Sequence, residues 1–361
     1  MLRLAYFISP HGFGHAARAA AVMQAVFKAD DAVHFDIFTS VPCWFFQDSL
    51  TAPFSYHELL SDIGLVQKTA FEADLNETLH KLFEFLPFQP LLIKEIATTV
   101  RKLNCALIIC DISPMGIAVG MQAGIPSLLV ENFTWDWIYQ QYADTNTAAP
   151  FNGHIDYLQN LFTAVQYHIQ TEPVCNPGPV DLTTAPVSRE IKNPPGRIRK
   201  QLGLRADSKM VLITTGGIKQ EYNFLDQLKR LRSMTFVLPG AGLQMETRDN
   251  LILLPERPDL YHPDLVNACD AVVGKVGYST LAEVYHAGVP FGYAARSNFR
   301  ETGPLLDFIN REMNGVLLDE SEFSRGYWRT KLENLLDMPR VQRSAPNGAD
   351  QIGRFITGII R

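Results

Sequence analysis

Two histidines flank a glycine-rich turn near the start of the chain. The segment Ser9–Arg18 reads Ser-Pro-His-Gly-Phe-Gly-His-Ala-Ala-Arg and follows a short apolar run. Imidazole is the usual side chain for removing a hydroxyl proton near neutral pH, so His15, directly after Gly14, is a candidate general base. His11 is a second candidate, and either ring can instead hydrogen-bond its own turn. Gly12 and Gly14 permit a tight turn, after which a helix N-terminus can face an anion.

Asp111 is a candidate partner for His15, because it directly follows the apolar run Ala106–Cys110. The carboxyl ends of parallel strands share one edge of a sheet, so its carboxylate is expected at the rim where His15 lies. There it would fix the imidazole tautomer and stabilise the imidazolium. The alternative is a helix N-cap for the segment that starts at Pro114.

A second cluster of glycines and polar residues lies in the C-terminal half. The segment Asp270–Glu283 reads Asp-Ala-Val-Val-Gly-Lys-Val-Gly-Tyr-Ser-Thr-Leu-Ala-Glu, a pattern typical of a strand, a loop and a helix. Glu283 can accept both hydroxyls of a ribose, or it can pair with Thr280 in a capping box. Free amides and hydroxyls at the start of this helix predict a phosphate site, with Gly274, Lys275, Ser279 and Thr280 as its members.

Two more loops follow expected strands in this half. Thr214-Thr215-Gly216-Gly217 forms a second glycine turn, whose amides can approach a diphosphate or serve only as a turn. The loop Ala295–Thr302 carries polar side chains suited to sugar hydroxyls, with Arg300 interpreted as part of a solvated surface. The candidates for sugar binding on this loop are Arg296, Asn298 and Glu301.

Short apolar runs alternate with longer helical patterns, which predicts β-α-β units, parallel sheets and the α/β class. The alternation starts twice, so two doubly wound, Rossmann-like domains are expected to face each other across a cleft. The expected strands are Leu4–Ile8, Val33–Phe38, Ala106–Cys110, Ser127–Val130, Met210–Thr214, Thr235–Leu238, Ile252–Leu254, Ala271–Val273 and Phe291–Tyr293. The expected helices are Ala16–Lys28, Met115–Ala123, Tyr222–Leu231, Tyr278–His286 and Pro304–Glu312.

The join between the halves is marked by Pro- and Gly-rich stretches, which place the boundary near residues 176–195. We expect an N-terminal, acceptor-side domain over 1–180 and a nucleotide-sugar-binding domain over 190–345. Residues 346–361 are expected to hold a last helix, near Asp350–Ile360, that can pack back on the first domain.

Composition excludes several classes of protein. The chain of 361 residues has a net charge of -6, whereas a duplex-nucleic-acid binder needs a basic footprint. Five scattered cysteines without C-x-x-C spacing argue against disulfides and a zinc site, and predict a reducing, cytoplasmic compartment. The N-terminus is interpreted as a strand rather than a signal peptide. The apolar window Cys105–Val130 is interrupted by Asp111, two prolines and a glycine, so no transmembrane helix is expected.

Three ligand motifs are absent or incomplete. Gly12–Ala17 fits the dinucleotide pattern G-x-G-x-x-A, but the expected second strand ends in Phe38-Thr39-Ser40 without the acidic residue that a dinucleotide site needs, and Asp36 lies inside that strand. No Walker motif follows the first loop. The chain also has no D-x-D, so we expect neither a metal site nor a resident cofactor.

The segment Gly274–Glu283, followed by Arg296–Glu301, resembles the donor-binding half of GT-B glycosyltransferases, a group that includes the enzyme making the lipid-linked disaccharide precursor of peptidoglycan. The resemblance implies that the helix-capping loop holds the diphosphate and that Glu283 binds the ribose. It also implies that polar residues around Glu301 bind the donor sugar, and that Gly14-His15 carries the proposed base.

Three further stretches resemble the glycosyltransferase-like N-terminal region of plant L-arabinokinases. They are His11–Ala16, Asn132–Tyr139 (Asn-Phe-Thr-Trp-Asp-Trp-Ile-Tyr) and Gly274–Thr280, and together they span the chain. The glycine/serine ATP loop of the kinase half has no counterpart, so arabinokinase activity is not expected. The aromatic side chains of Trp135, Trp137 and Tyr139 can form an acceptor platform or belong to the core.

These features predict a metal-independent glycosyltransferase that uses a nucleoside-diphosphate sugar, with UDP as the expected nucleotide, and an acceptor hydroxyl of unknown identity. Loop amides, the helix dipole and Lys275 would neutralise the diphosphate. A nucleotide-sugar hydrolase, a 2-epimerase and a non-catalytic nucleotide-sugar-binding module are the alternatives.

Overall fold

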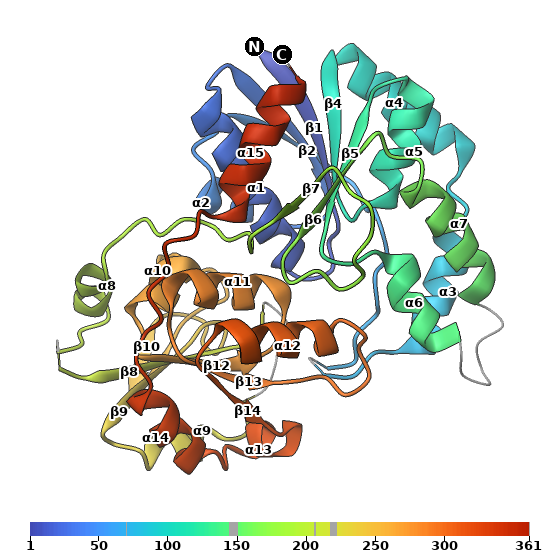
Figure 1. The fold of residues 1–361 in the computed structure, drawn as a ribbon. Helices are drawn as coiled ribbons and strands as arrows, with labels where there is room; N and C mark the ends of the chain where they lie inside the picture. Colours follow the sequence, from blue (N-terminus) through green and yellow to red (C-terminus); the bar gives the residue numbers. More distant parts are fainter. Residues whose placement is uncertain (70, 144–150, 206, 217–221, 361) are drawn as a thin grey trace.

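The computed structural model describes residues 1–361 except 70, 144–150, 206, 217–221 and 361. Two sheets of seven strands each form two domains, one above the other in Figure 1. The strand orders are β3-β2-β1-β4-β5-β6-β7 and β10-β11-β9-β8-β12-β13-β14. In each sheet a central strand (β1 or β8) starts two series that run outward in opposite directions, which is the doubly wound arrangement expected from the sequence.

All strands of the first sheet are parallel. Its strands are β1 (Leu2–Ile8), β2 (Val33–Thr39), β3 (Phe54–Glu58), β4 (Cys105–Asp111), β5 (Ser127–Glu131), β6 (Tyr167–Thr171) and β7 (Leu182–Thr184). Its helices are α1 (Gly14–Ala29), α2 (Cys43–Ser49), α3 (Leu75–Phe85), α4 (Pro90–Lys102), α5 (Pro114–Ala123), α6 (Trp135–Ala143) and α7 (Asn152–Phe162).

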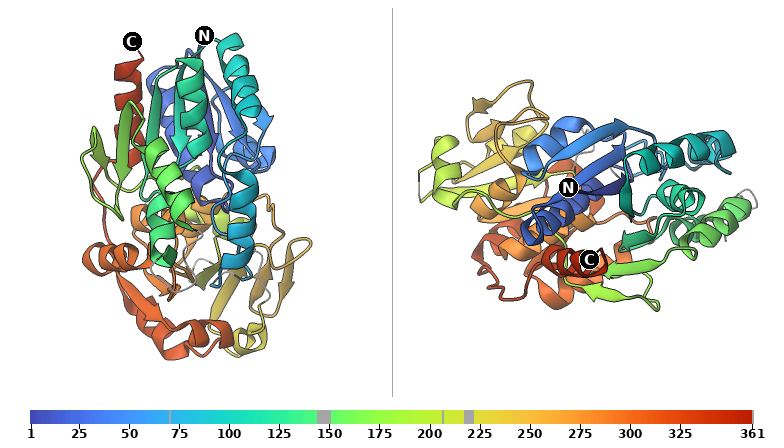
Figure 2. Two further views of the ribbon diagram at one scale, coloured as in Figure 1. Left: turned by 90° about the vertical axis from the view of Figure 1, so that its right-hand side faces the viewer. Right: turned by 90° about the horizontal axis from the view of Figure 1, so that it is seen from above.

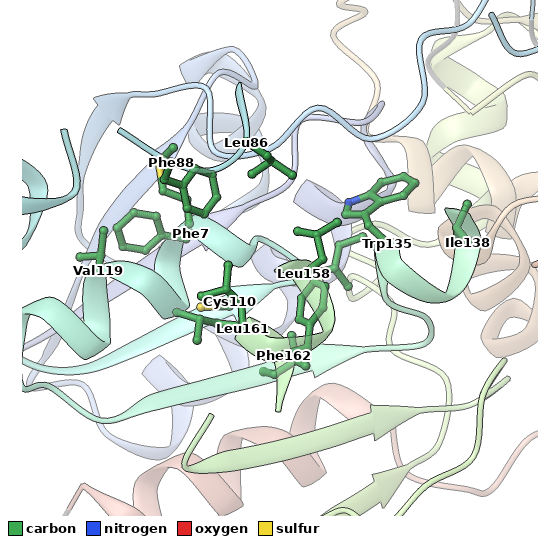
Figure 3. Packing of buried hydrophobic residues seen from close by; sticks show 14 of the residues in the cluster. Phe7, Leu86, Phe88, Cys110, Val119, Trp135, Ile138, Leu158, Leu161 and Phe162 are labelled. Carbon is green, nitrogen blue, oxygen red and sulfur yellow. The ribbon is translucent and has the colours of Figure 1, made fainter. Parts of the chain in front are cut away.

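Successive residues of β1 point into two separate cores, one on each face of this sheet. Phe7 packs with α4, α5 and α7, whereas Tyr6 packs with α1 and α15 (Gly348–Ile359). Because both faces are covered, the central strands β1, β4 and β5 are apolar almost throughout, as parallel sheets require. Figure 3 shows the first of these cores, with Phe7, Cys110 and Trp135 among its members.

The second sheet is parallel except for β10, which pairs antiparallel with β11. Its strands are β8 (Lys209–Thr214), β9 (Met234–Leu238), β10 (Glu246–Arg248), β11 (Leu251–Leu253), β12 (Ala271–Lys275), β13 (Phe291–Ala294) and β14 (Gly315–Leu318). Its helices are α8 (Pro195–Gln201), α9 (Leu225–Lys229), α10 (His262–Ala268), α11 (Tyr278–Ala287), α12 (Thr302–Glu312), α13 (Glu320–Arg325) and α14 (Arg329–Asp337).

All nine expected strands are present within two residues of their expected ends. The helix expected over Tyr222–Leu231 is shorter, and α9 covers only Leu225–Lys229. Strands β3, β6, β7, β10 and β14 were not predicted, because they lie at or near the edges of the sheets and are incompletely buried, so their sequences lack a continuous apolar run.

The chain crosses between the domains twice. After β7 it passes through residues 185–194 into the second domain, and after α14 it returns to end in α15 on the first. Helix α15 packs along α1, and Figure 2 shows both ends of the chain on the first domain. A Cβ on Gly353 would lie 3.0 Å from the carbonyl carbon of Ala25, so glycine lets these helices approach closely.

The two crossing segments are hydrogen-bonded to each other. Asn347 Nδ2 donates to the Ser188 carbonyl at 2.8 Å, and the Ser188 amide donates to Asn347 Oδ1 at 3.2 Å. The Ala185 amide donates to Gln351 Oε1 at 2.8 Å. The segment around residue 188 is therefore held by hydrogen bonds to the start of α15.

Candidate functional site

A cavity of about 760 Å³ lies between the two domains and is lined by residues of both. Its first-domain wall includes the loop after β1 and the start of α1, and its second-domain wall includes the start of α11 and the loop after β13. Such a crevice at the carboxyl ends of parallel strands is where open α/β sheets bind ligands. Predicted site residues in its lining are His11, Gly12, Gly14, His15, Gly216, Lys275, Ser279, Thr280, Glu283, Arg296 and Glu301.

His15 and Asp111 form a buried hydrogen-bonded pair at the rim of the first sheet. Asp111 ends β4 and pairs in register with Ile8, the last residue of β1, so both loops start from one level. His15 Nδ1 lies 2.9 Å from Asp111 Oδ1. Neither residue occupies the N-cap position of a helix, because Phe13 precedes α1 and Ser113 precedes α5. The pair has the geometry of a base and its orienting carboxylate.

Arg18 is a third member of this cluster that the sequence did not indicate. It lies one helical turn after His15 and is 1% exposed. Its Nε and Nη2 donate to the two oxygens of Asp111 at 2.9 and 2.6 Å. Burial would raise the pKa of Asp111, but the charge and hydrogen bonds of Arg18 outweigh that effect and hold it below its ordinary value. The carboxylate facing His15 is therefore ionised.

His11 lies on the same wall in a different environment. Its ring stands edge-on to Trp135, with the ring centroids 5.1 Å apart, and Gln67 Nε2 lies 3.3 Å from its Nε2. Burial, followed by the neighbouring His15 and Arg296, lowers the pKa of His11 well below its ordinary value. A ring with so low a pKa is a weak base, which argues against His11 as the group that removes the proton.

The start of α11 faces the same space from the second domain. Ser279 Oγ donates to the carbonyl of Gly14 at 2.6 Å, so the two predicted loops touch across the domain interface. Lys275 ends β12, and no hydrogen bond or ion pair of its ammonium occurs within the described part of the chain. Burial, together with the charge of Arg296, lowers the pKa of Lys275 to about 7 despite the opposing effect of Glu301. An anionic ligand would restore that charge.

Glu283 is buried in the cavity wall and already holds two partners. Arg189 donates to its Oε1 through Nη2 at 2.9 Å, and His262 Nδ1 lies 2.7 Å from its Oε2. Burial would raise the pKa of Glu283, but the charges of Arg189 and His262 lower it to about 2. Thr280 does not cap α11, whose N-cap is Gly277, so the capping-box alternative fails. Arg189 and His262 were not predicted, because their pairing depends on contacts 94 and 21 residues away in sequence.

The loop after β13 brings two more predicted residues into the cavity. Arg296 stacks on the Phe299 ring at 3.6 Å, and Glu301 accepts a hydrogen bond from Asn132 Nδ2 at 3.0 Å. Asn132 belongs to the first domain, so this bond also joins the two walls. Both Arg296 and Glu301 are buried, with 7% and 4% exposure.

Five predicted residues lie outside the cavity lining, and Gly217 lies outside the described residues. One of the five, Asp111, is connected to the cavity through its hydrogen bond with His15. A Cβ on Gly274 would lie 2.1 Å from the Thr214 carbonyl oxygen, so this glycine serves the contact between β12 and β8. Asn298 has an exposed side chain. Trp135 and Trp137 are 1% and 7% exposed and belong to the core of the first domain, so the geometry gives no support to an acceptor platform there.

Among the described residues, no group of three or more His, Cys, Asp or Glu side chains is arranged to hold a metal ion. Likewise, none of the helices in the described ranges is long and apolar enough to cross a membrane.

Solved structures of glycosyltransferases superpose on the whole chain. Spinosyn forosaminyltransferase SpnP matches with a TM-score of 0.66 at 15% identity, covering 100% of both chains. Arabidopsis thaliana UGT89C1 in complex with quercetin gives 0.65 at 11% identity and covers 99% of both. Medicago truncatula UGT71G1 in complex with UDP-glucose gives 0.58 at 14% identity, covering 100% of this chain and 98% of that one. The chain has the GT-B fold.

Sequence relatives agree with this GT-B architecture. L-arabinokinase of Arabidopsis thaliana is 28% identical over 357 residues, which cover 97% of this chain. The chain spans only 33% of the length of that relative. An uncharacterized glycosyltransferase of Methanopyrus kandleri is 19% identical, covering 72% of this chain and 78% of the relative. No family model matches the sequence. The resemblances inferred from the three motif stretches are thus confirmed at the level of fold and relatives.

Proposed function

We propose that this GT-B protein is a glycosyltransferase that moves a sugar from a nucleoside-diphosphate sugar, with UDP as the nucleotide, to an acceptor hydroxyl. The observation that carries the proposal is the placement of His15, which is paired with the buried Asp111, and of the N-terminus of α11 in the lining of one cavity. A base and an anion-binding helix end on opposite walls suit a reaction in which a hydroxyl loses a proton while a diphosphate departs.

Proton transfer starts the proposed reaction. Asp111 accepts the Nδ1–H of His15, which leaves Nε2 of the neutral ring as the acceptor for a proton. The acceptor hydroxyl transfers its proton to Nε2 as its oxygen bonds to the anomeric carbon. The bond between that carbon and the diphosphate oxygen breaks, and its electron pair leaves with the nucleoside diphosphate.

Charge on the departing diphosphate is stabilised by the second-domain wall. The free amides of the first turn of α11, the hydroxyl of Thr280 and the cations of Lys275 and Arg296 supply this stabilisation. With these groups in place no divalent ion is required, which supports metal independence together with the absence of D-x-D in the sequence. Glu301, fixed by Asn132, is the proposed ligand of the donor sugar.

Glu283 remains the proposed partner of the ribose. A carboxylate offers about four lone-pair positions, and Arg189 and His262 use part of them. Both partners hold the two oxygens in a fixed orientation, so a ribose hydroxyl meets an acceptor that is already ordered.

Cytoplasmic location stays a prediction, supported by five free cysteines.

Ligand screening followed by turnover tests this proposal. Nucleoside diphosphates are first ranked by thermal shift, where a true ligand at 100 times its dissociation constant adds about 2.7 kcal/mol to the free energy of unfolding. The protein is then incubated with the corresponding nucleotide sugars and a set of hydroxyl acceptors, and the products are separated by mass spectrometry.

Donor incubated alone separates the alternatives. Release of free sugar to the same extent with and without acceptors indicates a nucleotide-sugar hydrolase, and a donor sugar inverted at C2 indicates a 2-epimerase. Binding without any product in either condition indicates a binding module. Acceptor-dependent glycoside formation that disappears in His15→Ala, and persists in His80→Ala, supports the transferase. His80 is a suitable control because it lies on α3 with its side chain 65% exposed.

A further inference from the structure

Arg18 donates hydrogen bonds to two residues of the first domain, and its guanidinium also contacts an aromatic ring of the second domain. Besides its two bonds to Asp111, Arg18 Nη1 donates to Asn132 Oδ1 at 2.7 Å. Its guanidinium lies over the ring of Tyr278 from the second domain, 4.8 Å from the centroid. Tyr278 in turn accepts a hydrogen bond from the Val187 amide at 3.0 Å.

A continuous buried chain of polar contacts therefore runs from the base to the opposite wall. It passes from His15 through Asp111, Arg18 and Asn132 to Glu301. Arg18 is the middle residue of this chain of contacts. It donates to Asp111 through Nε and Nη2 and to Asn132 through Nη1. Its planar fork can satisfy Asp111 and Asn132 together, which an ammonium group cannot do.

Removing the charge of an arginine from water costs free energy unless the arginine is paired with an anion. Asp111 is 0% exposed and would be costly as an isolated anion, so the two charges compensate each other. This compensation has a chemical consequence. A carboxylate whose charge is already compensated by arginine attracts a proton on a neighbouring ring less strongly, so the main effect of Asp111 on His15 is to fix the orientation of the ring.

We propose that Arg18 is the positioning residue of the reaction: it orients Asp111 toward Nδ1 of His15 and compensates the charge of that carboxylate, so that the ring presents Nε2 to the acceptor hydroxyl. The proposal rests on the proposed function for the identity of the base. The arrangement of the ring and the carboxylate is itself a property of the ligand-free protein, and it can be measured without turnover.

Arg18→Met is the informative variant, because methionine fills most of the same space without charge. The uncompensated Asp111 carboxylate then attracts the proton, so we expect His15 to titrate at a pH higher by about one unit or more. The acidic limb of the pH profile of kcat/KM should move up by the same amount. At pH 7 we expect kcat to fall by about 100-fold, while the dissociation constant for UDP changes less than about threefold.

The chain offers a matched control on the same sheet. Arg3 donates through Nε and Nη2 to Asp36 at 2.9 and 2.6 Å, and His57 Nε2 lies 3.0 Å from the same carboxylate. This second arginine–aspartate–histidine cluster does not line the cavity. Arg3→Met should therefore leave the pH profile of turnover unchanged, although it removes an arginine–aspartate ion pair of the same bidentate geometry.

The tautomer and the titration of the His15 ring are the two measurements that test the proposal. NMR of the nitrogen-15-labelled histidine rings, with the His15 signals identified by their loss in His15→Gln, reports tautomer and titration in ligand-free protein. A His15 ring that titrates identically in wild type and Arg18→Met overturns the positioning role. That result is independent of whether glycosyl transfer is found, so failure of the proposed function and failure of this inference are distinguishable.

Arg18→Lys covers the case in which Arg18→Met does not fold. Lysine keeps the charge but loses the fork, so the titration of His15 should stay near that of wild type while kcat falls about 10-fold or more. Wild-type kcat in Arg18→Lys would show that any cation suffices and would overturn the orienting part of the proposal.

Discussion

Replacing Lys275 by methionine should abolish a proton uptake that accompanies nucleotide binding. Lys275 is buried, and its pKa lies at about 7 in the empty cavity against an ordinary value of 10.5. At pH 8 about one-tenth of the molecules carry the ammonium, and a bound diphosphate favours the charged form. Wild type should therefore take up about 0.9 proton per UDP at pH 8 and about 0.1 at pH 6.

Calorimetry of UDP binding in two buffers with different ionisation enthalpies measures this uptake directly. Lys275→Met should show an uptake near zero at pH 8, and its affinity for UDP should no longer fall as pH rises above about 7. Lys200→Met is the control, since Lys200 is exposed on α8 and outside the cavity lining. Equal uptake in wild type and Lys275→Met would refute the assignment of Lys275 to the diphosphate.

The lowered pKa of Lys275 also makes the free energy of unfolding depend on pH. The unfolded chain binds the Lys275 proton up to pH about 10.5, whereas the folded chain releases it near pH 7. Between these values unfolding takes up a proton, so the contribution of Lys275 to the free energy of unfolding becomes more favourable as pH rises. Lys275→Met should accordingly stabilise the ligand-free protein more at pH 7 than at pH 9, which chemical denaturation at both values checks.

Three further outcomes are expected. His15→Ala should lower turnover by about 100-fold or more with little change in UDP affinity, and near-normal turnover would remove it from the base role. Glu283→Ala should weaken nucleoside-diphosphate binding by about 1.5–3 kcal/mol, and a 2′-deoxyribose ligand should be less affected by the mutation. Simple addition of the two losses in calorimetry would mean that Glu283 does not touch the ribose. Activity should survive EDTA, and full loss that magnesium or manganese restores would contradict metal independence.

The loops that line the cavity could be predicted because their signals are local. A glycine turn after an apolar run, or a serine at the start of a helix, places a residue at the carboxyl edge of a parallel sheet without knowledge of distant contacts. His15, Asp111 and Ser279 were found in this way, and the structure brings all three to one interface.

Two of the site's cations, Arg18 and Arg189, could not be predicted, because their role depends on long-range pairing. Arg18 follows two alanines in a helix and resembles any surface arginine until Asp111 approaches from 93 residues away. Arg189 lies in the stretch without periodicity at the domain join, and only the fold carries it to Glu283. The tryptophans at 135 and 137 show the opposite case, since their motif attracts attention while their burial places them in the core.

The double crossing between the domains has a mechanical consequence. With a single linker, one domain could rotate freely relative to the other. Here two adjacent chain segments connect the domains, and the hydrogen bonds between Asn347 and Ser188 join these segments, so they resist such rotation. Arg189 directly follows Ser188 in the first crossing segment and pairs with Glu283, so the joined segments are also fixed to the second-domain wall of the cavity.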